Sequence, residues 1–154
     1  MPAKATSNQG LELIKKFEGF RGNFYHDQVG AKTIGYGHAC HGDGQNCAGV
    51  TEPLSEPQAM SLLKDDLRSR EECVAGSLTT PLGGNSFSAL VSYAFNVGCE
   101  AFKSSPVLSL VNQKRFGEAA NALKAQCYIS GLKLEDLVVR REAEASLFCL
   151  DGIC

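Results

Sequence analysis

The chain has 154 residues, of which 44% are hydrophobic and 21% charged, and its formal net charge is -2. Folding at this length buries roughly 68–70% of the surface of the unfolded chain, which is enough for one domain with a full core. The near-neutral charge argues against a nucleic-acid-binding domain, and no apolar run is long enough to span a bilayer. We therefore expect a single domain over residues 1–154, with residues 1–9 as an N-terminal tail and no nucleic-acid or membrane partner.

Seven cysteines are more than a reduced cytosolic enzyme usually carries. Their number indicates an oxidising destination rather than a fold that depends on disulfides. The first ten residues are small and polar and have no apolar core of a signal peptide. We expect a secreted, extracellular protein whose leader is absent from this chain.

The N-terminal third predicts one helix followed by a β-hairpin. Apolar residues recur at a period near 3.6 over residues 6–20, with Thr6 or Ser7 as the cap and Gly19 at the end. Residues 24–36 are rich in β-branched and aromatic residues around Gly30, a pattern typical of a hairpin. Residues 39–50 show no period and are expected to form a loop.

Beyond residue 51 the chain is expected to be helical throughout. Ser55 and Gln58 form a capping box at the start of a long helix that continues toward Cys73. Further helices are predicted over 87–98, from 105 onward, over 116–123 and over 134–148. The last is expected to turn four charged residues toward solvent: Arg140, Arg141, Glu142 and Glu144. The predicted fold is α+β and mainly α, with a small N-terminal hairpin lobe, a C-terminal helical lobe and a ligand cleft between them.

Three residues of the N-terminal segment suggest glycoside hydrolysis. Glu18 lies at the end of the first helix, whereas Asp27 and Thr33 lie on the two strands of the hairpin. With Gly30 at the centre of the turn, Asp27 and Thr33 would face each other across the strands. Glycoside hydrolysis needs two carboxyl groups in different settings, one to protonate the leaving oxygen and one to direct water or attack carbon.

The sequence around these residues resembles a known family. The stretch GLELIKKFEGFRGNFYHDQVGAKTIGYGH, residues 10–38, is similar to phage-type lysozymes, the endolysins or muramidases of glycoside hydrolase family 24. Their signature is Glu, eight residues, Asp, five residues and Thr, which Glu18, Asp27 and Thr33 fit without a gap. Residues 79–105 and 131–148 extend the resemblance over nearly the whole domain.

The resemblance implies a muramidase that cleaves the β-1,4 bond between N-acetylmuramic acid and N-acetylglucosamine in bacterial peptidoglycan. Glu18 then corresponds to the general acid, Asp27 to the carboxylate that directs water, and Thr33 to the residue that helps hold that water. This assignment implies inversion at the anomeric carbon. It implies no cofactor and no catalytic metal, and we expect a monomer.

Two other functions remain open at this stage. The same carboxylates could hydrolyse chitin or a related amino-sugar polymer. A non-catalytic antimicrobial or glycan-binding protein could also keep the fold, but it would be expected to lose one of the carboxylates or to carry a cationic amphipathic helix. Neither feature is seen in the sequence.

His38 could suggest a catalytic base, and with Cys40, His41 and Cys47 nearby it could suggest zinc. The resemblance implies instead that His38 packs against an aspartate of the long helix, either Asp66 or Asp65. A zinc site would need a fourth ligand that no familiar spacing supplies, so a disulfide between Cys40 and Cys47 is favoured.

The other cysteines are harder to pair from the sequence. Family members often carry a cysteine at the position of Cys99, so the resemblance makes Cys99 the candidate free thiol. The remaining two disulfides would then use four residues: Cys73, Cys127, Cys149 and Cys154.

Overall fold

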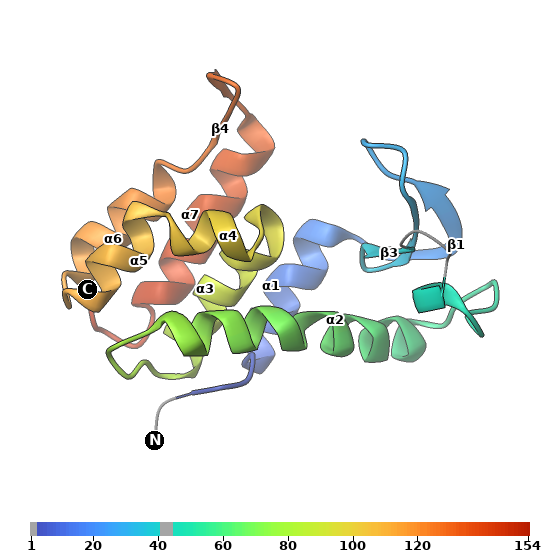
Figure 1. Cartoon of the computed structure of the whole chain (residues 1–154), viewed down its shortest axis with the longest axis horizontal. Helices are drawn as coiled ribbons and strands as arrows, with labels where there is room; N and C mark the ends of the chain where they lie inside the picture. The colour runs from blue at the N-terminus through green and yellow to red at the C-terminus, as the bar shows by residue number, and fades with distance from the viewer. Residues whose placement is uncertain (1–2, 41–44) are drawn as a thin grey trace. The chain divides into compact units, whose positions relative to one another are not determined.

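The computed structural model describes residues 3–40 and 45–154, and the chain forms two compact units. The sheet unit comprises Lys15–Leu67, and the helical unit comprises Met1–Ile14 with Arg68–Cys154. Figure 1 shows the helices and the small strands in chain order. The predicted α+β, mainly helical class is confirmed. No helix in the described part of the chain has the length and apolar character needed to cross a membrane.

The sheet unit is built around three antiparallel strands in the order β1-β2-β3. The elements of this part of the chain are the end of α1 (Asn8–Glu18), β1 (Arg21–His26), β2 (Lys32–Gly35), β3 (His38–Ala39), the 3-10 helix η1 (Gln45–Cys47) and the start of α2 (Glu56–Ser77). Ile34 of β2 is fully buried, and Thr33 beside it is only 2% exposed. β2 therefore lies in the middle of the sheet and in the core of this unit.

The hairpin has a different register from the predicted one. Thr33 pairs with Tyr25, not with Asp27, and His26 pairs with Lys32. The cause is the turn, because Gly30 has a positive φ of 84° and lies one residue past the centre of the loop 27–31. The shift of two residues keeps Asp27 on the side of the hairpin expected for it, because side chains alternate with a period of two.

Side-chain capping explains where the first two helices start. The Ser7 hydroxyl accepts a hydrogen bond from the Gly10 N–H at 3.1 Å, which caps α1. At α2, the Ser55 hydroxyl accepts from the Gln58 N–H at 3.3 Å while the Gln58 side chain accepts from the Ser55 N–H at 2.9 Å. The predicted capping box is therefore present, and α2 continues to Ser77.

The helical unit has α3 at its centre. Phe87, Leu90 and Val91 of α3 are fully buried, and α7 packs against both α3 and α6. The helices α5, α6 and α7 lie side by side in the yellow to red part of Figure 1. The elements of this unit beyond α2 are α3 (Gly84–Val97), α4 (Cys99–Lys103), α5 (Pro106–Asn112), α6 (Phe116–Lys124), β4 (Tyr128–Ile129), β5 (Leu132–Lys133) and α7 (Glu135–Cys149).

The β4–β5 hairpin contradicts the prediction that the chain is helical throughout after residue 51. Ser130 and Gly131 both have positive φ, 52° and 80°, as a two-residue hairpin turn requires. The strands are two residues long and exposed, so their sequence shows no alternation of buried and exposed residues.

The charged residues of α7 do not all face solvent as predicted. Arg140, Arg141 and Glu144 are at most 5% exposed, and only Glu142 of the four is exposed. Glu144 lies 3.2 Å from Nε of each arginine and accepts a hydrogen bond from Ser92 of α3. These groups form a buried polar cluster, which offsets the cost of removing charges from water.

The structure contains the Cys40–Cys47 disulfide, but the other cysteines pair differently from the prediction. Cys73 bonds to Cys99, and Cys149 bonds to Cys154, while Cys127 is the buried free thiol. The expectations for Cys99 and Cys127 were therefore wrong. The packing of α2 near α4 brings Cys73 and Cys99 to a Cα–Cα distance of 6.2 Å, a tertiary contact that spacing in sequence does not reveal.

Candidate active site

Glu18 is the last residue of α1, and its carboxyl group lies against the main chain of Gly37. A Cβ at Gly37 would stand only 2.8 Å from Oε1 of Glu18, so a side chain at this position would displace the Glu18 carboxyl group. Gly37 also has a positive φ of 75°, a conformation that side chains with a Cβ rarely adopt. The half-buried Glu18 side chain is therefore placed by the end of α1 and by the turn between β2 and β3.

Asp27 stands at the start of the β1–β2 turn and organises it. Its Oδ1 atom accepts hydrogen bonds from the N–H groups of Val29 at 3.0 Å and Ala31 at 2.8 Å. This is the Asx-type arrangement that fixes tight turns. Among the described residues, nothing hydrogen bonds to the other carboxylate oxygen, Oδ2, which remains able to accept from a substrate or water.

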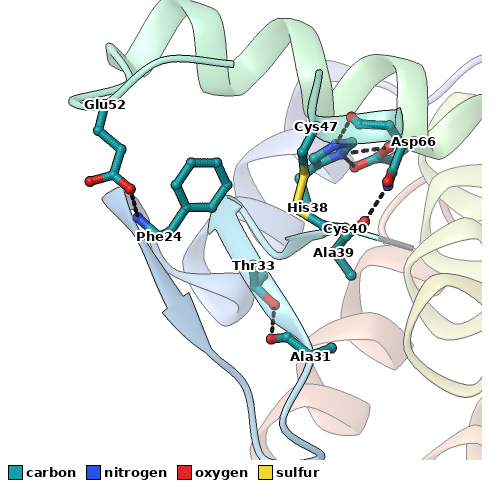
Figure 2. The surroundings of a disulfide bond; sticks show 10 residues. Phe24, Ala31, Thr33, His38, Ala39, Cys40, Cys47, Glu52 and Asp66 are labelled. Carbon is teal, nitrogen blue, oxygen red and sulfur yellow. Dashed lines mark hydrogen bonds and ion pairs between the residues drawn. A yellow bond between two sulfur atoms is a disulfide. The ribbon is translucent and has the colours of Figure 1, made fainter. Parts of the chain in front are cut away.

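Thr33 lies in β2 between the strands β1 and β3. Its hydroxyl donates to the Ala31 carbonyl at 2.8 Å, as Figure 2 shows, which leaves its oxygen lone pairs as acceptors. The same carbonyl also accepts from the N–H of Asp27 at 3.0 Å. Ala31 therefore links the two residues through its main-chain atoms, although they are not direct partners in the sheet.

Tyr25 is the pairing partner of Thr33 and was not singled out in the sequence. Burial raises the pKa of its hydroxyl, the nearby Arg21 lowers it, and the charges of Glu18 and Asp27 raise it further. The Arg21 guanidinium lies 4.6 Å from the centre of the Tyr25 ring. Tyr25 thus lies within electrostatic range of both candidate catalytic carboxylates.

The segment Gly35–Tyr36–Gly37–His38 connects this site to α2. A Cβ on Gly35 would meet Ala59 at 3.3 Å, so the strand approaches α2 closely. The Tyr36 hydroxyl donates to Glu56 at 2.8 Å, and the same carboxylate lies 3.1 Å from Nζ of Lys15 on α1. These contacts hold the end of α1, the sheet and the start of α2 together around Glu18.

His38 pairs with Asp66 rather than with Asp65. Its Nδ1 lies 2.8 Å from Oδ2 of Asp66, and its Nε2 lies 2.7 Å from the main-chain oxygen of Asn46. Figure 2 shows the ring beside Asp66 and close to the Cys40–Cys47 disulfide. The hydrogen bond to Asp66 is the largest cause that raises the pKa of His38, while burial opposes it. Both ring nitrogens have acceptors, which suits a structural imidazolium.

The alternative of a zinc site has no support from the described part of the chain. No group of three metal-binding side chains is found among residues 3–40 and 45–154. Cys40 and Cys47 are joined to each other, so neither is available as a thiolate ligand. His41, the third residue of the alternative, lies outside the described residues.

Comparison with known proteins gives consistent matches along the chain. The family model named Phage lysozyme matches residues 15–144. The endolysin of Salmonella phage P22 is 36% identical over 143 residues, which cover 92% of this chain and 96% of the relative. The endolysin of Bacillus phage B103 is 39% identical over 144 residues, but the chain spans only about half of that relative, 53% of its length.

Solved structures agree with the sequence matches. A muramidase domain of SpmX from Asticaccaulis excentricus is 40% identical, with a TM-score of 0.81 and coverage of 92% of this chain and 95% of that one. A mutant of P22 lysozyme is 32% identical, with a TM-score of 0.82 and coverage of 94% and 97%. The fold, the family match and these relatives agree, and the chain belongs to the phage lysozyme family, with the enzyme class of a lysozyme.

Proposed function

We propose that this chain is a muramidase that hydrolyses the β-1,4 bond between N-acetylmuramic acid and N-acetylglucosamine in bacterial peptidoglycan, with inversion. The observation that carries the proposal is the arrangement of Glu18, Asp27 and Thr33 around the β1–β2 hairpin in a phage-lysozyme fold. Relatives named endolysin and muramidase support peptidoglycan over chitin as the substrate.

The hydrogen bonds of Asp27 and Thr33 suit them to hold one water molecule. Oδ1 of Asp27 is used by the turn, so Oδ2 is the oxygen that accepts from the water. The Thr33 hydroxyl has given its hydrogen to Ala31, so its oxygen can accept the second hydrogen of the same water. The lone pair of the water then points to the anomeric carbon.

The reaction would proceed in one displacement. Glu18 donates its proton to the departing glycosidic oxygen while the water attacks the anomeric carbon, and Asp27 takes the proton released by the water. The bond to the leaving sugar breaks as the new C–O bond forms on the opposite face. The anomeric configuration is therefore inverted, and each carboxyl group must exchange a proton before the next turnover.

Other features support the assigned setting. The helical unit has a pocket whose walls include Asn96, Gln126 and Tyr128, groups that can hydrogen bond to or stack on a glycan and its peptides. The three disulfides support action outside the cytoplasm, after export.

The proposal is tested by digesting purified peptidoglycan and chitin oligomers and analysing the products by mass spectrometry and anomer-resolved NMR. We expect peptidoglycan fragments with reducing muramic acid ends whose first-formed anomer is α. Cleavage of chitin alone would favour the other substrate class, and a first-formed β anomer would overturn inversion.

The role of Glu18 is tested by Glu18→Gln, with Glu12→Gln on the exposed side of the same helix as the matched control. The first variant should fold and lose wall lysis, and the control should lyse walls at the rate of the parent. A folded Glu18→Gln protein with full activity would refute the proposed mechanism.

A further inference from the structure

β3 is a very short strand at one edge of the sheet, and it pairs with the part of β2 that carries Thr33. It consists of His38 and Ala39, which pair with Ile34 and Thr33 of β2. The N–H of Cys40 extends this pairing by donating to the Lys32 carbonyl at 2.8 Å. So few main-chain hydrogen bonds hold a strand weakly, because each contributes only about 0.5–1.5 kcal/mol.

Asn46, which lies outside the sheet, contacts both residues of β3. The main-chain oxygen of Asn46 lies 2.7 Å from Nε2 of His38, and the side-chain amide of Asn46 donates to the Ala39 carbonyl. The hydrogen bonds from His38 and to Ala39 are visible in Figure 2. Asn46 therefore contacts the residue that pairs with Ile34 and the residue that pairs with Thr33.

A covalent bond fixes the place of Asn46. The neighbouring residue, Cys47, is joined to Cys40, which directly follows β3, with a Cα–Cα distance of 5.5 Å. Asn46 also lies within the 3-10 helix η1, which restricts its backbone. The disulfide keeps the Asn46 amide near β3 even when the noncovalent contacts break, because Asn46 is next to Cys47 and Cys40 is next to β3.

We propose that Asn46 is a positioning residue for Thr33, and that the Cys40–Cys47 disulfide holds Asn46 in place. Asn46 fixes Ala39 and His38, these hold β3 in register on β2, and β2 carries the Thr33 hydroxyl. The inference rests on the proposed function, in which that hydroxyl helps to orient the attacking water. On this proposal the Cys40–Cys47 disulfide affects turnover, which a disulfide with a purely stabilising role would not do.

The first variant is Asn46→Ala, which removes the amide donor to Ala39 and keeps the main-chain oxygen that faces His38. We expect kcat on soluble peptidoglycan fragments to fall by about tenfold or more, since small misplacements of reacting groups have effects of that size. KM should stay within about twofold, because substrate-binding groups are not altered. The amide NMR signals of Thr33 and Ala39 should shift.

The second variant is the double change Cys40→Ser with Cys47→Ser, and its matched control is Cys149→Ser with Cys154→Ser. Both disulfides close short loops, of 7 and 5 residues of separation, but the control bond lies at the end of the helical unit. The first double variant should lower kcat as Asn46→Ala does, and the control should keep the parental kcat. The double variant carries the test if Asn46→Ala fails to fold.

A double-mutant cycle separates positioning from a general loss of structure. If Asn46 acts through the Thr33 hydroxyl, Asn46→Ala should lower kcat in the parent but have little further effect in a Thr33→Val background. Equal fold losses in both backgrounds, or full kcat in both loop variants, would overturn the inference. A Thr33→Val protein with the parental kcat would instead refute the proposed role of Thr33, so the two failures are distinguishable.

Discussion

The main chain of Gly37 lies so close to Glu18 that a Cβ at Gly37 would stand 2.8 Å from the Glu18 carboxyl oxygen. The contact joins the proposed general acid to a turn 19 residues further along the chain. A side chain at position 37 would therefore push the Glu18 carboxyl group out of its place.

Gly37→Ala should lower activity by at least roughly tenfold by displacing the Glu18 carboxyl group. The substitution also strains the backbone, since φ at Gly37 is 75°. The matched control is Gly49→Ala, where φ is 80° but no atom lies within 4 Å of the added Cβ. Both variants should lose about 1–2 kcal/mol of stability, and only the first should lose activity. Equal activities at matched stability would contradict the role of this contact.

Thr33→Val should reduce kcat by roughly 100-fold, because it removes the hydroxyl that is proposed to orient water while keeping the side-chain shape. The Ala31 carbonyl keeps its hydrogen bond from the Asp27 N–H, so the loss of stability should be only about 1 kcal/mol. Thr33→Ser retains the hydroxyl and should retain most of the activity. The measurement is steady-state turnover of soluble fragments beside urea unfolding; a fully active valine variant would exclude the water-holding role.

Raising the pH should destabilise the protein through His38. The hydrogen bond to Asp66 raises the pKa of His38 above 6.5 in the folded state. The folded state therefore holds a proton that the unfolded state releases, so the stabilisation is complete below about pH 6.5 and is lost as pH rises through the folded pKa. Urea unfolding across this range should show the decrease.

The variant His38→Asn should remove this pH dependence and lower stability more than it lowers turnover. NMR titration of the His38 ring in the parent should give a folded pKa above that of the unfolded chain. A large loss of rate at an unchanged melting temperature would contradict the structural role of His38.

Glu144→Ala should destabilise the protein by about 3–5 kcal/mol, because it leaves two buried arginines without their carboxylate partner. Glu142→Ala, two residues earlier on the exposed side of α7, should change stability by less than about 0.5 kcal/mol. The free energy of unfolding from urea titration measures both. A Glu144→Ala protein as stable as the control variant would show that the cluster contributes nothing.

The sequence predicted those parts of the fold that depend on neighbouring residues. The Ser55 capping box, the hairpin around Gly30 and the short Cys40–Cys47 disulfide each follow from groups at most 14 residues apart. The family resemblance pointed to the His38–Asp66 pair, whose members are 28 residues apart. The catalytic roles of Glu18, Asp27 and Thr33 stay predictions until the variants are measured.

The remaining features depend on three-dimensional packing. The hairpin register follows from the backbone conformation of Gly30, which spacing alone does not give. Arg141 and Glu144 are charged and so were expected in solvent, but each supplies the partner that lets the other be buried. The contact between Gly37 and Glu18 was not predicted, because it depends on the end of α1 lying beside the glycine-containing segment 35–38.

The buried free thiol of Cys127 can be used to measure local opening of the folded protein. The residue is only 4% exposed, whereas the other six cysteines form disulfides. A thiol reagent added to the oxidised protein should therefore modify one residue per molecule, and only when the segment joining α6 to β4 opens. The labelling rate would measure how often the native enzyme opens at that place. The same shielding should limit crosslinking between molecules through this seventh cysteine.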